Sequence, residues 1–150
     1  MAVVAGGWTD ESVLPEHRTF ETADLRALEP EVAARAGRLV LQRPGIIEKV
    51  RRSKVPATRL VDKRLAHRLE GRLGYSFPLS DPETPFPGPC LFINGRQDGM
   101  AGYDDAYGIL EGYPRASFAI LDRAGHSVAW EQPELFLALA RNWLDRVRSG

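Results

Sequence analysis

Apolar residues along this chain follow two different spacings, with the change near residue 90. Residues Ala2 to Ala5 are continuously apolar and stop at Gly6-Gly7, which is typical of a short strand buried on both faces. A polar stretch from Asp10 to Phe20 predicts a loop. Apolar side chains then recur at helical intervals, and prolines mark where helices begin. These helical positions are Leu25, Leu28, Val32, Ala33, Ala36, Leu39 and Val40, then Ile46, Ile47 and Val50 after Pro44, then Leu60, Val61, Leu65 and Leu69 after Pro56, ending near Gly71 and Gly74.

The second half of the chain alternates strands with helices. Five prolines lie between Ser76 and Pro89, so this stretch is predicted to be a stiff linker. A strand from Cys90 to Asn94, a helix from about Tyr103, a strand from Ser117 to Leu121 and a helix from Pro133 follow in turn. Helical crossovers between consecutive strands imply that the strands are parallel.

Together these patterns predict an α/β protein with about three parallel strands and flanking helices. Residues 1–20 would hold the first core strand and its loop, residues 21–80 a helical insertion, and residues 81–150 the β-α-β-α part of the core. At 150 residues the chain is long enough to bury a core of its own.

Charge and composition exclude several classes of protein. Lysine plus arginine number 20 and aspartate plus glutamate number 20, so no overall field favours nucleic acid or an anionic membrane. The basic stretch of Lys49, Arg51, Arg52, Lys54, Arg59, Lys63, Arg64, Arg68 and Arg72 is interpreted as the solvated face of helices. The single cysteine, Cys90, excludes a disulfide scaffold. The N-terminal residues have no basic leader and no run of signal-peptide length, so a cytoplasmic protein is expected.

Two polar residues stand just beyond the predicted strands of the second half. Asp98 follows the strand that begins at Cys90, and His126 follows the strand that ends at Leu121. Because parallel strands end at one edge of a sheet, where α/β proteins place their chemistry, we expect the carboxyl group and the imidazole to meet. Each residue also has a plainer interpretation, because Asp98 could form an Asx turn and His126 could be an ordinary loop histidine.

The run from Pro87 to Val147 carries the motifs G-R-Q-D, G-Y, Y-P-x-A, L-D-R-A-G-H, E-Q-P-x-L-F and W-L. It resembles the C-terminal part of the α/β-hydrolase fold, and the closest likeness is to bacterial members with a helical lid. The resemblance implies a catalytic triad in the chain order nucleophile, acid, histidine. Asp98 would be the acid and His126 the base, with Asp10 as a rival acid. It implies an ester or similar carbonyl substrate, and we expect neither a metal nor a cofactor.

The nucleophile of this triad has no clear candidate in the sequence. No G-x-S-x-G occurs in the 150 residues. Ser127, in Gly125-His126-Ser127-Val128-Ala129, is the nearest imitation, but it follows the histidine and no later histidine could serve it. The segment Gly74 to Pro78 matches less well. We therefore expect the nucleophile and the oxyanion hole to lie outside this chain, which would be the C-terminal portion of a hydrolase and inactive alone.

Other interpretations stay open. The chain could be a non-catalytic binding or dimerisation module that recruits a second copy, or a missing N-terminal half, through the exposed edge of its first strand. It could also belong to a dehalogenase or a C–C bond hydrolase of the same fold. Tyr103, Tyr107, Phe136 and Trp143 are expected in the core, whereas His17 and His67 are expected at the surface. Trp130 could line a pocket or cover the sheet, and Ile46, Ile47, Leu60 and Leu65 could roof a substrate or pack on the sheet.

Overall fold

Three parallel strands form the sheet of this protein, whose computed structural model describes residues 2–3, 14–69, 81 and 83–150. The strands are β1 (Ala2–Val3), β2 (Cys90–Gly95) and β3 (Ala116–Leu121), in the order β1-β2-β3. Ala2 is in register with Leu91 on one side of β2, and Phe92 is in register with Phe118 on the other. The expected parallel sheet of about three strands is therefore confirmed, while residues 4 and 5 of the first expected strand lie outside the described residues.

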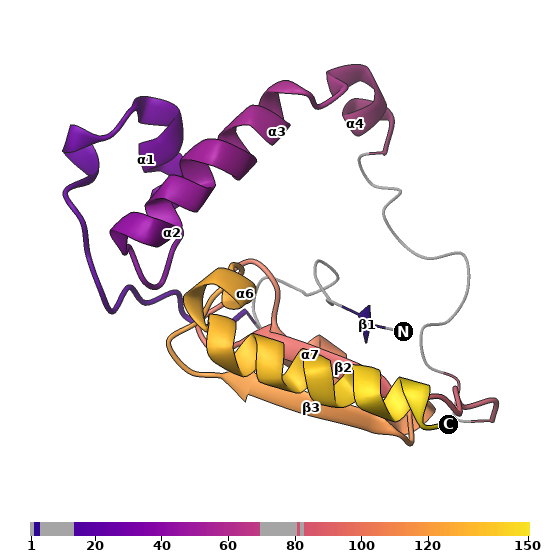
Figure 1. The fold of residues 1–150 in the computed structure, drawn as a ribbon. Helices are drawn as coiled ribbons and strands as arrows, with labels where there is room; N and C mark the ends of the chain where they lie inside the picture. Colours follow the sequence, from indigo (N-terminus) through magenta and orange to yellow (C-terminus); the bar gives the residue numbers. More distant parts are fainter. Residues whose placement is uncertain (1, 4–13, 70–80, 82) are drawn as a thin grey trace.

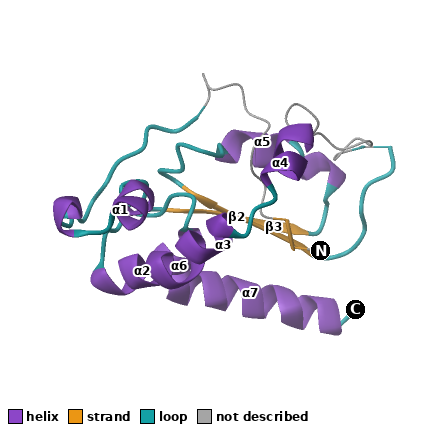
Figure 2. Cartoon of the chain, turned by 90° about the horizontal axis from the view of Figure 1, so that it is seen from above, coloured by secondary structure: helices purple, strands orange, loops and turns teal. Residues whose placement is uncertain are grey.

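Helices cover both faces of this sheet (Figures 1 and 2). On one face Phe92 packs with Ala106 of α5 (Tyr103–Gly108) and with Tyr113, which follows the short 3₁₀ turn η4 (Leu110–Gly112). On the other face Leu91 and Ile93 pack with α6 (Val128–Glu131) and α7 (Pro133–Arg148). Successive residues of β2 point to opposite faces, so burying every residue requires a helix on each side.

A helical segment, residues 21–69, stands over the end of the sheet next to α6 (Figure 1). It contains the 3₁₀ turn η2 (Leu25–Ala27), α1 (Pro30–Ala36), α2 (Pro44–Lys49), the π-helical turn η3 (Val50–Lys54), α3 (Val55–Arg59) and α4 (Lys63–Leu69). It has an apolar cluster of its own, centred on Val32, Leu39, Ile46, Ile47 and Val50. Ile46 and Ile47 therefore pack within the helical segment.

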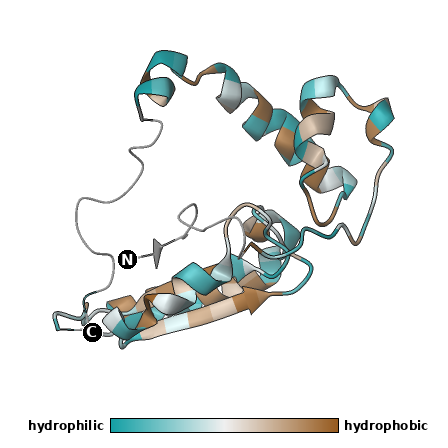
Figure 3. Ribbon diagram, turned by 180° about the vertical axis from the view of Figure 1, so that it is seen from behind, coloured by the Kyte–Doolittle hydropathy of each residue, from teal (hydrophilic) through white to brown (hydrophobic). Residues whose placement is uncertain are grey.

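The stretch from α2 to α3 is one continuous helix with a π turn in its middle. Figure 3 shows apolar and polar stretches alternating along it. Pro56 has no N–H, and its ring would clash with the carbonyl group four residues earlier in a regular α-helix. The N–H of Val55 bonds instead to the carbonyl oxygen of Val50, five residues back. The wider turn accommodates the proline and ends at Lys54.

Two helical predictions were wrong in their extent. The helix that begins at Pro30 ends at Ala36, so Leu39 to Leu41 lie beyond it, with Leu41 bridged to Glu21. The helix expected through Leu60 is interrupted there, and Asp62 starts α4 anew by accepting the N–H groups of residues 64 and 65. As a result Leu60 is 85% exposed and Leu65 44% exposed, so neither belongs to a core.

The aromatic side chains divide between core and surface. Phe136 and Trp143 of α7 pack against the sheet, and the Trp143 Nε1–H donates to the carbonyl oxygen of Pro89. Tyr103 is half-buried and its hydroxyl accepts from Arg96. Tyr107 was expected in the core but is 66% exposed, because only one edge of its ring meets Phe118. No helix in the described part of the chain is long and apolar enough to cross a membrane.

Candidate active site

Asp98 sits directly after β2, in a tight turn that fixes its carboxylate. Its side chain is almost fully buried. One carboxylate oxygen, Oδ1, accepts the N–H groups of Met100 at 2.9 Å and Ala101 at 3.1 Å. This is the Asx-type turn that the sequence allowed. The other oxygen, Oδ2, remains available for a partner outside the turn.

That partner is His126, in the loop after the neighbouring strand β3. The distance between His126 Nδ1 and Asp98 Oδ2 is 3.2 Å. β2 and β3 pair in parallel along their whole length, so the loops that follow them leave the sheet at the same edge. The carboxyl group and the imidazole therefore meet as their positions in the sequence predicted. Their catalytic role stays a prediction.

The pairing with Asp98 favours the protonated form of His126 and determines which ring nitrogen carries the proton in the neutral form. The hydrogen bond to Asp98 raises the pKa of the imidazole above its usual 6.5, although partial burial and the positive charge of Lys54 act in the opposite direction. In the neutral ring the Nδ1–H donates to Asp98, which leaves the lone pair on Nε2. Among the described residues none hydrogen-bonds Nε2, and 45% of the side chain remains exposed. His126 can therefore accept a proton from outside its own loop.

A buried glutamate holds the His126 loop against the helical segment. Glu131 is 2% exposed, and its Oε2 accepts the N–H of Gly125 at 2.7 Å. Its Oε1 accepts the N–H groups of Val40 at 2.6 Å and Leu41 at 3.3 Å. The sequence analysis did not identify Glu131, because its only signal was the position inside the E-Q-P motif. It is a positioning residue for the loop of the candidate base.

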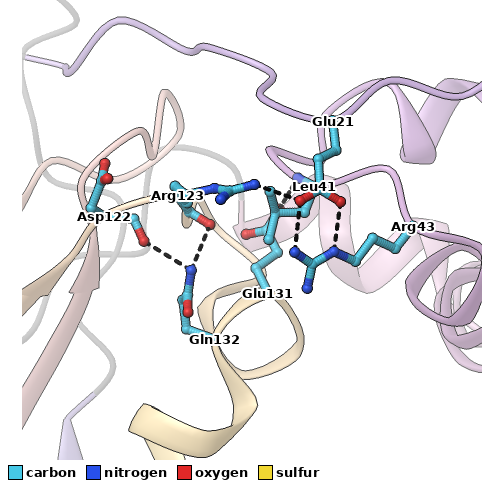
Figure 4. Close-up of polar contacts among 7 residues, drawn as sticks. All are labelled: Glu21, Leu41, Arg43, Asp122, Arg123, Glu131 and Gln132. Atoms are coloured by element: carbon cyan, nitrogen blue, oxygen red, sulfur yellow. Dashed lines mark hydrogen bonds and ion pairs between the residues drawn. The ribbon is translucent and has the colours of Figure 1, made fainter.

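Surface contacts reinforce this junction (Figure 4). Glu21 accepts hydrogen bonds from Arg43 in the helical segment and from Arg123 in the His126 loop. Gln132 donates to the carbonyl oxygens of Asp122 and Arg123. Arg123 itself has a φ of 54°, a left-handed conformation that non-glycine residues rarely adopt. Contacts on both sides of the loop hold it in this turn.

Gly95, the last residue of β2, allows the His126 loop to lie close to the strand. A Cβ atom at this position would collide with the carbonyl oxygens of Ala124 and Gly125. A side chain here would thus push the loop away from Asp98.

Three cavities open around His126. The largest measures about 400 Å³ and is lined by Asp98, Arg38, Met100 and His17 among others. His17 is exposed, as expected, and it also borders the candidate site. A second, of about 270 Å³, extends between His126 and the helical segment. A third, of about 200 Å³, runs along Trp130. Trp130 packs against the apolar cluster of the helical segment and so joins both parts. His67 is exposed on α4.

Lys54 was expected on a solvated face, but it lies at the candidate site. Its Nζ donates to Ser127 Oγ at 2.8 Å and stands 5.0 Å from the centre of the Trp130 ring. Burial lowers the pKa of its ammonium group. The Ser127 hydroxyl is the acceptor in this contact, and among the described residues no hydrogen bond joins it to His126.

The remaining candidates from the sequence are Asp10, the segment from Gly74 to Pro78, and Cys90. Asp10 and the segment from Gly74 to Pro78 lie outside the described residues. Cys90 is fully buried in β2, and burial raises the pKa of its thiol, which disfavours the reactive thiolate. Within the described ranges no group of three or more histidine, cysteine, aspartate or glutamate side chains could hold a metal ion.

Comparisons with known proteins bear on the fold. No protein-family model and no curated protein sequence matches the chain. Among solved structures, an α/β superfamily hydrolase from Oenococcus oeni PSU-1 aligns with a TM-score of 0.76 and 17% identity, over 90% of this chain and 51% of that one. This chain thus spans about half the length of that protein.

Two further likenesses are more partial. A thermophilic esterase from Thermogutta terrifontis aligns over 39% of this chain and 22% of its own, with 29% identity and a TM-score of 0.37. The 2-hydroxy-6-oxo-6-phenylhexa-2,4-dienoate hydrolase from Rhodococcus sp. strain RHA1 aligns over 68% of this chain and 38% of its own, with 19% identity and a TM-score of 0.47. Overlaps this weak carry no argument about function. The parallel sheet, its helical layers and the alignment with the Oenococcus oeni protein show that this chain has part of the α/β-hydrolase fold.

Proposed function

We propose that this chain supplies the acid and the base of a hydrolase site that cleaves an ester or a similar carbonyl substrate. The observation that carries the proposal is the contact between His126 Nδ1 and Asp98 Oδ2, at the ends of two neighbouring parallel strands. The second ring nitrogen has no partner among the described residues and the ring borders the cavities. A base needs this arrangement, with one nitrogen oriented and the other available.

In the proposed mechanism, Nε2 of His126 takes the proton of a nucleophile as the nucleophile attacks the carbonyl carbon of the substrate. The proton then passes to the leaving alcohol as the acyl group is transferred to the nucleophile. Water, deprotonated by the same imidazole, then attacks the acyl group, and the imidazole returns this proton to the nucleophile as the acyl bond breaks. Ester and water thus become acid and alcohol, and the nucleophile is regenerated. Asp98 orients the ring and stabilises its protonated form.

The nucleophile is proposed to come from outside these 150 residues, since they contain no G-x-S-x-G motif. Ser127 is a poor substitute, because it follows the base directly in the chain and no hydrogen bond joins its hydroxyl to the His126 ring among the described residues.

Two measurements on the purified chain test the proposal. The first is the NMR titration of the His126 ring. Asp98→Asn should lower the pKa of His126, because the carboxylate is the main cause of its upward shift. Asp122→Asn is the matched control, since Asp122 contacts Gln97 and not the imidazole. An unchanged His126 pKa in Asp98→Asn would refute the pairing.

The second measurement is turnover of a p-nitrophenyl ester. We expect the chain to show no more turnover than its His126→Ala variant, because the attacking group is missing. Strong turnover that disappears in His126→Ala would show a nucleophile within the chain, and Ser127→Ala would then be the next variant.

The alternative proposal, a binding or dimerisation module, rests on the open edges of the sheet. Within the described residues β1 and β3 are both edge strands. Unpaired strand edges recruit partners. Light scattering distinguishes this alternative, because a stable monomer at high concentration would contradict it.

A further inference from the structure

The cavity between His126 and the helical segment has a positively charged wall. It measures about 270 Å³ and is bordered by His126, Ser127, Arg35, Arg38, Lys54 and Thr58. None of its lining residues is an aspartate or a glutamate. The two carboxylates nearest to it, those of Asp98 and Glu131, are already engaged by backbone N–H groups and by His126.

The cations of this wall differ from four other arginines of the helical segment. Arg43, Arg51, Arg52 and Arg59 each form an ion pair with a glutamate within the segment. Arg35, Arg38 and Lys54 have no ion-pair partner among the described residues. The wall of the cavity therefore brings together three cations without an ion-pair partner among the described residues. Lys49, Lys63, Arg64 and Arg68 also have no such partner there, but they are exposed and do not line this cavity.

Two of the three cations are held in place by neighbouring side chains. Thr58 Oγ1 accepts from Arg35 Nη2 at 2.7 Å and donates to the carbonyl oxygen of Lys54 at 2.8 Å. Lys54 is half-buried, and the charge of Arg35 is near enough to lower its pKa further. An ammonium group has three N–H donors, and Ser127 accepts only one of them. The hydroxyl proton of Ser127 also remains free to donate.

Arg35 and Lys54 are partly buried and Arg38 is exposed, so three like charges stand at one cavity whose lining has no carboxylate. Charge-assisted hydrogen bonds from guanidinium and ammonium groups are the usual means of binding carboxylates and phosphates. We infer that the cavity beside His126 binds a negatively charged oxygen group of the substrate, a carboxylate or a phosphate, through Lys54, Arg38 and Arg35. This inference rests on the proposed function and names the class of substrate: a carbonyl compound with an anionic group near the bond to be cleaved.

The test measures binding of small anions to the purified chain by calorimetry and NMR. Benzoate and phenyl phosphate are the probes, and benzamide is the neutral counterpart. We expect saturable binding of at least one anion, with shifts at the resonances of His126 and Ser127, and none of benzamide. Tighter binding of benzoate would indicate a carboxylate site, and tighter binding of phenyl phosphate would indicate a phosphate site.

Matched variants show whether the cavity or the bulk charge is responsible. Lys54→Met and Arg38→Gln should each weaken anion binding about tenfold, the usual cost of one charge-assisted hydrogen bond. Lys49→Met and Arg52→Gln remove the same charges at exposed positions that do not line the cavity, and they should leave the dissociation constant within about twofold. Lys54→Arg keeps the charge and should retain binding, and thermal unfolding of each variant checks that it is folded.

Three results would overturn the inference: no saturable binding of either anion, equal binding of benzamide, or equal weakening in the exposed control variants. The Asp98→Asn titration separates this outcome from the fate of the proposed function. Anion binding that depends on Lys54 and Arg38, with an unchanged His126 pKa in Asp98→Asn, would support the anion site and refute the acid–base pair. No anion binding, together with a lowered His126 pKa in Asp98→Asn, would refute the anion site but not the acid–base pair.

Discussion

Replacing Glu131 should destabilise the protein far more than replacing any exposed glutamate. Its carboxylate accepts N–H groups of Val40 and Gly125 at 2.6 and 2.7 Å, and that of Leu41 at a longer 3.3 Å. In Glu131→Ala these donors lose their acceptor inside the protein. Each buried, unsatisfied donor costs about 1–3 kcal/mol, so the two short bonds alone amount to about 2–6 kcal/mol of unfolding free energy. Such a loss is a large part of a typical total of about 5–15 kcal/mol.

Equilibrium unfolding in urea measures this difference, with Glu134→Ala as the control. Glu134 is exposed in the first turn of α7, and its loss should cost no more than about 1 kcal/mol. Glu131→Gln should fall between the two, because the amide oxygen can still serve Val40 while its NH₂ group faces the N–H of Gly125.

Hydrogen exchange adds a local readout, since the amides of Val40 and Gly125 should exchange faster in both Glu131 variants than in Glu134→Ala. A cost below about 1 kcal/mol for Glu131→Ala, with unchanged exchange at these amides, would refute the reasoning. It would mean that the His126 loop and the helical segment are held together by other contacts.

Two further predictions concern pH and packing. Because the pKa of His126 is raised in the folded state, its pairing with Asp98 adds stability that is complete below the unfolded pKa near 6.5 and is lost as pH rises through the folded pKa. Unfolding measured at a series of pH values should show wild type losing stability relative to His126→Gln over that window, and parallel curves would contradict it. Ile47→Ala should cost about 2–5 kcal/mol, whereas Leu60→Ser should change the free energy of unfolding by no more than about 0.5 kcal/mol, because only Ile47 is buried. If Ile47→Ala and Leu60→Ser lost similar amounts of unfolding free energy in urea, Leu60 would have to be packed against other residues in solution.

Local patterns were enough for the sheet and for the position of the candidate pair. The runs around Phe92 and Phe118 have strand-like lengths, and the helices between them require parallel pairing. Parallel strands end at a common edge, so Asp98 and His126 had to come near each other. The prediction that Asp98 forms an Asx turn was also correct. The same side chain forms the turn with one oxygen and contacts the imidazole with the other.

The course of the helical segment was less predictable. Leu39 and Val40 have a helical spacing after Pro30, but both lie beyond the end of α1, and the N–H of Val40 bonds to Glu131, 91 residues later in the chain. A periodic pattern shows which side of a helix is apolar, but not whether a distant acceptor will draw its last turn into another conformation. The prediction for Leu60 failed for a local reason. Its spacing fits one helix that continues past it, but the helix stops there and Asp62 begins a new one, so the Leu60 side chain is exposed.

Spacing along the chain was sufficient to predict the α/β class, the parallel pairing and the edge of the sheet where the candidate acid and base stand. The roles of Glu131, Lys54 and Arg38 became visible only in the folded protein. The burial and charge of such side chains depend on partners far away in the sequence: Lys54 and Ser127 are 73 residues apart, yet they form one hydrogen bond. A basic residue on a helix looks the same in the sequence whether it faces water or a cavity, and packing alone distinguishes the two.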